Sequence, residues 1–424
     1  MATRYVFIHL PGQTEAVPAG RLELVEDGTR LLTSRFLYGN LYRQRPNALE
    51  IDPLSLPLAG ERGVEREPVA GLALFGAIRD AAPDSWGRRV IENRLRAPPN
   101  TLAESTYLDQ AGSDRAGALD IRAARDSPPT ERPLPSTLDL RYLLEAAERI
   151  EAGEPVPARL AAYFDAAPTL GGARPKAVVD VDGRPFVAKF PLPSDPFNMP
   201  VIERATLELA RRAGLQVPET RIQTLADGRD VMLIARFDRE PAGRGLARRH
   251  MVSALTMLGV HEQQSPDQSY AAMAEVISRR GPADALRTDR EELFGRMVFN
   301  ILVSNDDDHL RNHAFVFDAA AGGWRLSPLY DVVPKPQSGT ERKLHLSIGP
   351  RGRLATLDNA LDGAGQFGLL RPRAVGIIER IVAVVREWRQ VFDELGVPAR
   401  QSDHMRSAFR RADDVGLRIV RSGR

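Results

Sequence analysis

Three consecutive acidic residues, Asp306, Asp307 and Asp308, follow an apolar stretch and precede His309. Adjacent carboxylates repel one another and lose solvation when they are buried, so packing alone does not favour them here. A bound metal ion, or a proton that must be moved, would explain them. Asp307 and Asn312 are five positions apart, the spacing of a kinase catalytic loop, in which the Asp orients the attacking hydroxyl and the Asn binds Mg²⁺. An acidic, solvated loop is the alternative interpretation.

A fourth aspartate, Asp331, follows a short segment, residues 324–326, that is typical of a strand. An Asp at the end of a strand can bind a divalent ion that bridges nucleotide phosphates. Asp before β-branched residues is common, so Asp331 gains weight only together with Asn312. We expect Asn312 and Asp331 to be the two metal ligands.

His309 has two interpretations. A metal-dependent hydrolase could use residues 306–309 as ligands, and it would then need a transition metal and no ATP. A single His beside carboxylates is more often a hydrogen-bonding loop residue. We expect His309 to support the catalytic loop or the phosphates without acting as the base.

Lysine is rare in this chain. Of 58 basic residues, only Lys176, Lys189, Lys335 and Lys343 are lysines. Lysine differs from arginine in being a compact point charge on a flexible stem, which suits it to phosphate. The lysines are therefore candidates for phosphate contacts, although chance is an adequate explanation for Lys335 and Lys343.

Lys189 lies in an alternating segment, residues 186–190, whose larger apolar side chains share the opposite face of a predicted strand. A lysine that reaches from a strand to the α- and β-phosphates is the kinase arrangement, and a helix glutamate normally holds it. Glu203, in the first turn of the next predicted helix, is the candidate. An exposed strand lysine is the alternative.

The glycine-containing segment Gly171-Gly172-Ala173-Arg174-Pro175-Lys176 could surround phosphates with backbone N–H groups. It matches neither GxxxxGK[ST] nor GxGxxG, so it predicts neither a P-loop ATPase nor a dinucleotide-binding fold. A tight turn that needs two glycines is the alternative.

The composition of the whole chain is that of a globular protein. It has 424 residues, a hydrophobic fraction of 43%, a charged fraction of 27% and a formal net charge of +2. This charge gives no overall attraction to nucleic acid or to membranes. The absence of cysteine excludes disulfides and cysteine zinc sites. The first residues lack the apolar core of a signal peptide, so we expect a cytoplasmic protein without membrane contact.

The elements that must position these residues form a β-rich half followed by an α-rich half, which favours an α+β fold with a cleft between lobes. We expect three parts, residues 1–135, 136–238 and 239–424, with a proline-dense linker at 127–136. A capping box at residues 288–291 predicts the start of one late helix, and a helical period continues through residues 377–392. The other predicted elements are strands at 4–9, 21–25, 31–37, 177–181, 185–190, 220–225, 230–237 and 324–326 and helices at 87–95, 138–151 and 201–213.

Taken together, these segments resemble the HipA family of serine/threonine kinases, the toxins of bacterial toxin–antitoxin pairs. The order and spacing of several short segments carry the resemblance across most of the chain. They are Asp84-Ser85-Trp86-Gly87-Arg88, the glycine-containing segment, Val187-Ala188-Lys189-Phe190, Ile202-Glu203, Arg236-Phe237-Asp238-Arg239, residues 305–312 and Leu329-Tyr330-Asp331-Val332.

The resemblance implies a two-lobed, protein-kinase-like fold close to the phosphatidylinositol kinases. Its N-terminal β-rich subdomain and N-lobe core would precede an all-α C-terminal lobe. It also implies ATP and Mg²⁺ as cofactors, with Asp307 as the catalytic Asp and Lys189 on the phosphates. Thr169 corresponds to the hydroxyl residue that family members autophosphorylate. The residues that it implies around the nucleotide are Gly171, Gly172, Ala173, Lys176, Lys189, Ala235, Phe237, His309, Asn312, Tyr330 and Asp331.

The family further implies a protein substrate and a helix-turn-helix antitoxin, with DNA contacted only through the complex. Known family targets include aminoacyl-tRNA synthetases. Two alternatives stay open from the residues alone: a kinase that acts on a small molecule, and a catalytically silent ATP-binding partner or co-repressor.

Overall fold

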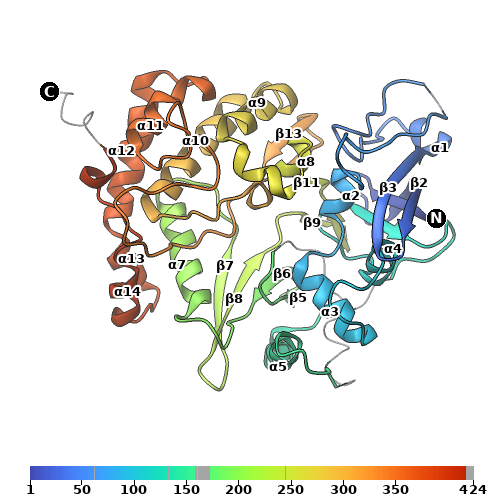
Figure 1. Ribbon diagram of the computed structural model, residues 1–424, viewed down its shortest axis with the longest axis horizontal. Coiled ribbons are helices and arrows are strands. Elements are labelled where there is room, and N and C mark those ends of the chain that lie inside the picture. Colours follow the sequence, from blue (N-terminus) through green and yellow to red (C-terminus); the bar gives the residue numbers. More distant parts are fainter. Residues whose placement is uncertain (62, 131–132, 158–159, 161–171, 244, 417–424) are drawn as a thin grey trace. The chain divides into compact units, whose positions relative to one another are not determined.

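The computed structural model describes the whole chain except residues 62, 131–132, 158–159, 161–171, 244 and 417–424 (Figure 1). Thr169 and Gly171 therefore lie outside the described residues. The chain divides into two compact units. The first unit is Met1–Ser194 with Gln223–His261, and the second is Asp195–Ile222 with Glu262–Arg424. The three-part division expected from the sequence stays a prediction.

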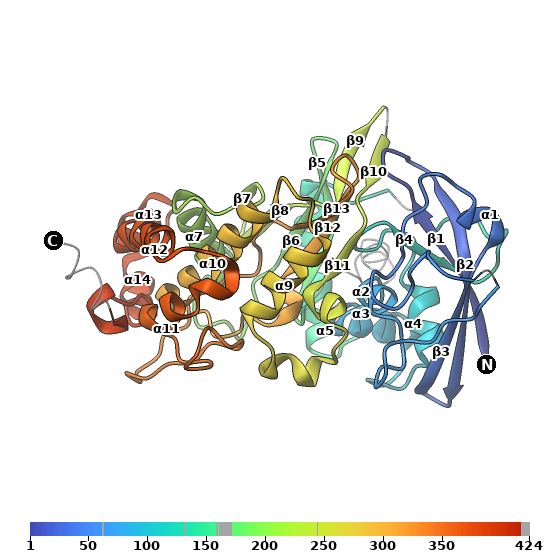
Figure 2. The same cartoon turned by 90° about the horizontal axis from the view of Figure 1, so that it is seen from above.

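The first unit begins with a four-stranded sheet in the order β3-β2-β1-β4 (Figure 2). The three long strands are β1 (Ala2–His9), β2 (Ala16–Asp27) and β3 (Arg30–Tyr38), and β4 (Leu119–Arg122) pairs with β1. All described pairings are antiparallel. β2 and β3 extend further than the alternating segments of the sequence predicted. β2 begins five residues earlier, through residues 16–20, which contain proline and glycine and do not alternate.

Short helices fill the chain between β3 and β4: α1 (Asn40–Arg43), α2 (Gly76–Asp80), α3 (Ser85–Leu95) and α4 (Glu104–Gln110). α3 confirms the predicted helix. Asp84 is its N-cap and accepts a hydrogen bond from the backbone N–H of Gly87 at 2.7 Å. An N-cap carboxylate satisfies one of the free N–H groups of the first turn and interacts favourably with the helix dipole.

A second sheet in the first unit has the order β5-β6-β8-β7. β5 (Lys176–Val181) and β6 (Arg184–Lys189) form the predicted hairpin, and β8 (Asp230–Ala235) pairs with β6. Asp182 and Gly183 both have positive φ, as a two-residue hairpin turn requires. One face of this sheet packs with α5 (Leu140–Glu151) in a single apolar cluster. The remaining elements of the unit are β7 (Thr220–Thr224), which bridges the boundary, β9 (Arg239–Ala242), β10 (Gly245–Arg248), β11 (Met251–Ser253) and α8 (Ala254–Leu258).

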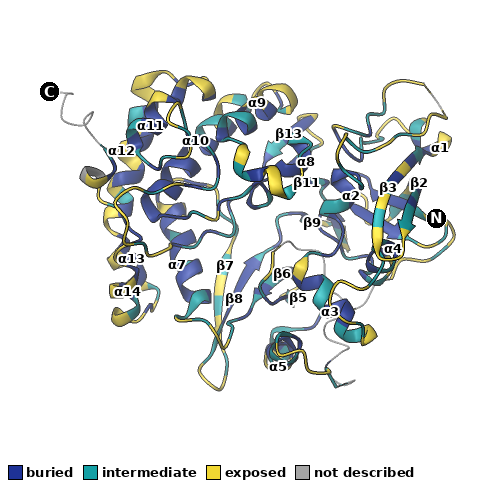
Figure 3. Cartoon of the chain, in the orientation of Figure 1, coloured by how far each residue is buried: buried dark blue, intermediate teal, exposed yellow. Residues whose placement is uncertain are grey.

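The second unit is mainly helical. Its central helix, α10 (Leu286–Val303), is buried along most of its length (Figure 3). α9 (Tyr270–Arg280) and α12 (Arg371–Arg386) pack against it. Around them lie α7 (Met199–Arg212), α11 (Leu357–Asp362), α13 (Trp388–Glu394), α14 (Ala399–Met405) and the hairpin of β12 (Ala314–Asp318) and β13 (Gly323–Leu326).

Three expectations for this part of the chain are wrong. The β12–β13 hairpin shows that the C-terminal part is not all-α. The predicted capping box lies inside α10, which begins at Leu286 after Ala285 without a side-chain cap. The helical period at residues 377–392 spans two helices, because the chain leaves helical geometry at Glu387 between α12 and α13. In the described part of the chain, no helix combines the length and apolarity needed to cross a membrane.

Candidate active site

The predicted catalytic loop follows α10 directly. Ser304 ends the helix in the left-handed conformation with φ of +53°. The backbone N–H of Asn305 then bonds to the Asn300 carbonyl at 3.0 Å, which closes the last turn. The loop continues to a short 3₁₀ turn, Leu310–Asn312, and enters β12. A buried helix and a strand thus hold both ends of the loop.

Asp307 and Asn312 are linked within this loop. The Asn312 side-chain amide donates to the backbone carbonyl of Asp307 at 2.9 Å. The same carbonyl accepts the backbone N–H of His309 at 2.9 Å. Asp307 itself is exposed, whereas Asn312 is buried. Because the amide nitrogen of Asn312 is engaged, its Oδ1 is the group left to accept a cation.

Asp308 differs from its two acidic neighbours. It is 1% exposed, and its carboxylate accepts hydrogen bonds from the Tyr270 hydroxyl and from His313 Nε2. Burial alone would raise the pKa of Asp308, but the neighbouring His313 and the hydrogen bonds from His313 and Tyr270 outweigh it and lower that pKa. Burial, followed by the charge of Asp308, raises the pKa of Tyr270 well above its ordinary value. The expectation that packing has no use for three aspartates is therefore wrong for Asp308.

Sequence reasoning missed Tyr270 and His313. Tyr270 lies 38 positions from Asp308 in sequence, so local spacing carries no trace of the contact. His313 directly follows Asn312, and its apolar neighbours in β12 were the only signal that it would be buried.

His309 is half-buried, with its ring 5.9 Å from that of His345 in an edge arrangement. Among the described residues, no hydrogen-bond partner reaches its buried Nδ1. Its backbone carbonyl accepts the N–H of Asn312 at 2.9 Å. Burial, followed by the charge of His309, lowers the pKa of His345.

Asp331 lies five residues beyond β13, and its φ of +58° is unusual for a residue with a side chain. Such left-handed geometry is sparsely populated for a residue with a side chain and carries local strain. The preceding Tyr330 donates its hydroxyl to the carbonyl of Arg311 at 2.8 Å. This bond ties the Asp331 segment to the loop that carries Asn312, within the second unit.

Lys189 is the last residue of β6 and is half-buried. Its register partners are Lys176 on β5 and Met232 on β8. Directly opposite residues of an antiparallel pair point to the same face, so the two lysines share one face of the sheet. Phe186 and Ala188 point to the other face and lie in the apolar cluster, as the alternation of the sequence predicted.

Lys176 is buried, and its ammonium pairs with Asp84 at 3.3 Å. Both side chains are nearly inaccessible, at 5% and 6% exposure. Trp86 donates its indole N–H to the Lys176 carbonyl at 2.9 Å. Gly172 has φ of +99°, and a Cβ there would lie 3.1 Å from Lys176 Nζ. The backbone of the predicted phosphate segment therefore passes close over this ammonium.

The rest of that segment is anchored by α3. The guanidinium of Arg89 donates to the carbonyl of Ala173 at 2.6 Å. Glu203 lies on α7 in the second unit and is buried. Whether it holds Lys189 stays a prediction.

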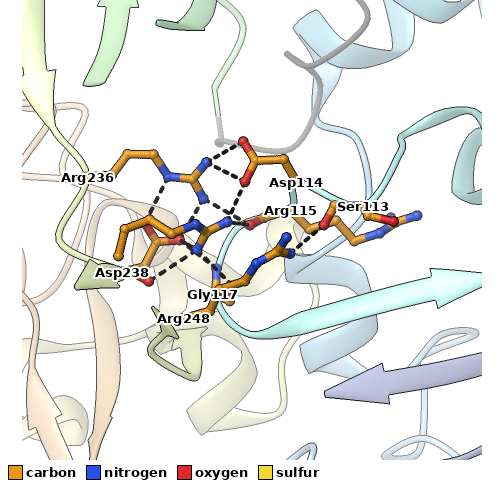
Figure 4. Close-up of polar contacts among 8 residues, drawn as sticks. Ser113, Asp114, Arg115, Gly117, Arg236, Asp238 and Arg248 are labelled. Atoms are coloured by element: carbon orange, nitrogen blue, oxygen red, sulfur yellow. Dashed lines mark hydrogen bonds and ion pairs between the residues drawn. The ribbon is translucent and has the colours of Figure 1, made fainter. Parts of the chain in front are cut away.

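The family resemblance implies that the backbone around Ala235–Phe237 is the hinge that meets adenine. Ala235 and Phe237 flank Arg236. Ala235 ends β8, and the N–H of Arg236 continues the ladder to the Pro185 carbonyl at 3.1 Å. Arg236 is 1% exposed at its side chain and binds the carboxylates of Asp238 and Asp114, at 2.8 Å and 2.9 Å (Figure 4). The backbone at the predicted hinge is thus fixed by a buried ionic network.

Arg239 completes this hinge network, defined as Asp114, Arg236, Asp238 and Arg239 with the backbone of residues 113–117. Its guanidinium binds Asp114 at 2.6 Å and Asp238 at 2.8 Å. Gly117 donates its N–H to Asp238 at 2.8 Å. A Cβ at Gly117 would lie 3.1 Å from the Met251 backbone, so the close approach requires glycine.

The arginines of the hinge network shift the pKa values of the charged groups around them. Burial alone would raise the pKa of Asp238, but Arg236 and Arg239 outweigh it and hold that pKa far below its ordinary value. Burial alone would also raise the pKa of Asp114, but the same two arginines lower it. Arg248, which donates to the Ser113 carbonyl, has its pKa lowered to about 10 by burial and by the neighbouring Arg239.

Asn312 and Asp331, the predicted metal ligands, both lie in the second unit and offer oxygen donors. Among the described residues, no group of three or more His, Cys, Asp or Glu side chains could hold a metal ion. Mg²⁺ binds through one or two protein oxygens and completes its shell with water and substrate phosphates. An amide oxygen at Asn312 and a carboxylate at Asp331 fit that pattern.

Known proteins resemble this chain in sequence and in fold. A protein of Sinorhizobium fredii named "Putative kinase Y4mE" is 25% identical over 388 residues, which cover 83% of this chain and 88% of that protein. The solved structure of HipA from Shewanella oneidensis MR-1, in a complex with HipB and operator DNA, aligns with a TM-score of 0.65 and 19% identity. That alignment covers 97% of this chain and 95% of HipA.

The structural likeness shows that the mixed α/β architecture is that of HipA. The model of the HipA-like C-terminal domain matches residues 168–388, more than half of the chain. The matched span contains Lys189, Asp307, Asn312 and Asp331. The chain therefore belongs to the HipA-like family.

Proposed function

We propose that this chain is an ATP- and Mg²⁺-dependent serine/threonine protein kinase. The observation that carries the proposal is the loop after α10, in which Asp307 is exposed while Asn312 is fixed to its carbonyl at 2.9 Å. An exposed Asp can meet a hydroxyl of another molecule, and a buried, oriented Asn can hold a metal ion. The Sinorhizobium fredii relative is named a putative kinase, which supports this proposal.

The reaction would be in-line transfer of the γ-phosphoryl group of ATP to a Ser or Thr hydroxyl. The hydroxyl oxygen attacks the γ-phosphorus, the bond to the β-bridging oxygen breaks, and ADP leaves. Asp307 orients the hydroxyl and takes its proton, while Lys189 neutralises phosphate charge. Asn312 and Asp331 would hold Mg²⁺, which supplies further charge neutralisation when bound.

The remaining nucleotide contacts belong to the same proposal. Backbone N–H groups around Gly172 and Ala173 would face the phosphates, with Lys176 beneath them. The backbone of residues 235–237 would meet adenine. His309 and Tyr330 would support the loop around Asn312 and the phosphates.

We further propose that the chain is the toxin of a toxin–antitoxin pair in the cytoplasm. Its partners would be a helix-turn-helix antitoxin and a protein substrate, with DNA reached only through the antitoxin complex. The solved HipA was found with HipB and operator DNA, which supports this assignment. Thr169, outside the described residues, is the proposed site of autophosphorylation.

The test is transfer from γ-labelled ATP with Mg²⁺, followed by mass spectrometry of the chain and of candidate substrates. Asp307→Asn should lower transfer by about 10²–10⁴-fold, because general-base catalysis contributes that much, and should leave ATP binding nearly intact. Transfer that survives in Asp307→Asn contradicts the assignment. Transfer only to small molecules points to a small-molecule kinase, and ATP binding without any transfer points to a silent partner.

A further inference from the structure

The residues that follow Asp307 and Asn312 in the chain are also in contact with each other. Asp308 follows Asp307 in the chain, and His313 follows Asn312. The side chains of Asp308 and His313 meet at 3.0 Å, and both are almost completely buried. The two residues proposed to act on substrate and metal are therefore each next to one member of a buried pair.

The hydrogen bonds show which atoms of Asp308 and His313 donate and which accept. His313 Nε2 faces the carboxylate, and among the described residues no partner reaches its buried Nδ1. A hydrogen on Nε2 therefore has an acceptor in the Asp308 carboxylate. Asp308 then accepts from two donors, the His313 N–H and the Tyr270 hydroxyl.

The pair is anchored to the helices beneath the loop. Tyr270 is the first residue of α9, and its hydroxyl also accepts from the Asn300 side chain of α10 at 3.2 Å. Asn300 in turn accepts from the Asn305 side chain at 3.1 Å. A continuous hydrogen-bonded chain thus runs from the start of the loop, through two helices, to its end.

We infer that Asp308 and His313 form a staple that sets the separation between the Asp307 carboxylate and the Asn312 amide. They are positioning residues, since both side chains are almost completely buried. The inference rests on the proposed kinase function. A bond that only held the fold would change stability, whereas a bond that sets the loop geometry would change turnover as well.

His313→Leu removes the N–H donor and leaves the Asp308 carboxylate with one partner fewer. We expect kcat to fall by about 10–100-fold, the usual effect of losing a group that orients a metal ligand, and the KM for ATP to rise, because Asn312 would then hold Mg²⁺ less well. His313→Gln keeps an N–H donor of similar reach and should recover most of the loss. Thermal melting of each variant establishes that it is folded.

Ile381→Val is the matched control, because Ile381 is fully buried in α12 and the change weakens the same unit without touching the loop. It should lower the melting temperature and leave kcat unchanged. If His313→Leu behaves like this control, or if the Gln and Leu variants are equally impaired at equal stability, the staple is not a positioning device.

Nucleotide binding separates failure of this inference from failure of the proposed function. If the wild-type chain transfers no phosphoryl group, the proposed function fails, and ATP affinity is then measured by calorimetry with and without Mg²⁺. The affinity gained from Mg²⁺ should be lost in His313→Leu and kept in His313→Gln. An unchanged gain in the Leu variant overturns the staple.

Discussion

The Asp84 carboxylate has two partners in the first unit. It caps α3 through the N–H of Gly87, and it pairs with the buried ammonium of Lys176. The sequence motif around Asp84 was recognisable as a family segment, but its purpose was not, because its partner is 92 positions away. The structure explains why an Asp stands before Ser85-Trp86: it joins a helix start to the base of the predicted phosphate segment.

Asp84→Asn separates these two roles, since Asn is as good an N-cap as Asp but cannot neutralise Lys176. We expect a loss of about 3–5 kcal/mol in the free energy of unfolding, because one charge of a buried pair is left without its counter-ion. Asp84→Ala should cost about 1 kcal/mol more, through loss of the cap. Urea unfolding measures both.

The matched control is Asp362→Asn, which breaks the exposed pair with Arg351, where both side chains are about half exposed. It should change the free energy of unfolding by less than about 1 kcal/mol. Equal effects for the two Asn variants would contradict the importance assigned to the Asp84–Lys176 pair.

At the scale of elements, the hinge network holds the end of β8 against the loop before β4. Arg236 makes forked contacts with Asp238 and with Asp114, which a lysine ammonium cannot reproduce. Arg236→Lys should therefore lower the free energy of unfolding by about 3 kcal/mol or more, as for other broken buried pairs. Thermal and urea unfolding provide the measurement.

Arg229→Lys serves as the control in the same unit, because Arg229 binds Asp227 with both side chains more than a third exposed. Little change is expected there. If nucleotide is bound at residues 235–237, Arg236→Lys should also weaken ATP binding in calorimetry, and Arg229→Lys should not. If Arg229→Lys weakened ATP binding more than Arg236→Lys, the hinge network would not be part of the nucleotide site.

Elements with local signals could be predicted from the sequence, and elements with distant causes could not. The β5–β6 hairpin is encoded by Asp182-Gly183 and by alternation, both of which lie within a few residues. The start of α10 was misplaced because the helix begins at Leu286 without a side-chain cap, so the capping pattern at residues 288–291 does not mark its first turn. β13 confirms the strand predicted at residues 324–326. β12 was missed because a short strand between helices carries little periodicity.

In the candidate site, too, some features could be predicted from the sequence and others depend on distant contacts. The order of Lys189, Asp307, Asn312 and Asp331 is a property of the chain, so it could be read from the sequence. The burial of Asp308, the ion pair of Lys176 and the hinge network depend on residues more than 30 positions apart. No local pattern contains such pairings, so only the folded structure reveals them.

For the molecule as a whole, two buried histidines of the first unit make stability depend on pH. Burial and the nearby Arg248 and Arg239 lower the pKa of His9 to about 3, and burial lowers that of His250 to about 4. Both stay neutral in the folded chain while the unfolded chain binds protons below pH 6.5. Stability should therefore fall as the pH drops from about 6.5 towards 4, by about 2 kcal/mol per histidine at pH 5.

Melting temperatures between pH 7.5 and pH 5 test this expectation. His9→Gln should flatten the pH dependence, whatever it does to stability at pH 7.5, because one of the two groups that take up protons is removed. His404→Gln, at an exposed position in α14, should leave the slope unchanged. A slope that is the same in wild type and in His9→Gln would contradict the assignment.

The two compact units are interleaved along the chain, which constrains how the protein is made. The first unit needs Gln223–His261 in addition to its N-terminal segment, and the second needs Asp195–Ile222 in addition to its C-terminal one. During synthesis, the first unit can be completed only after His261 has left the ribosome, by which time the opening segment of the second has already emerged. That early segment, with the apolar face of α7, must wait for α12 and α13 before it can be covered, so a nascent chain arrested between these points should be the form most in need of a chaperone.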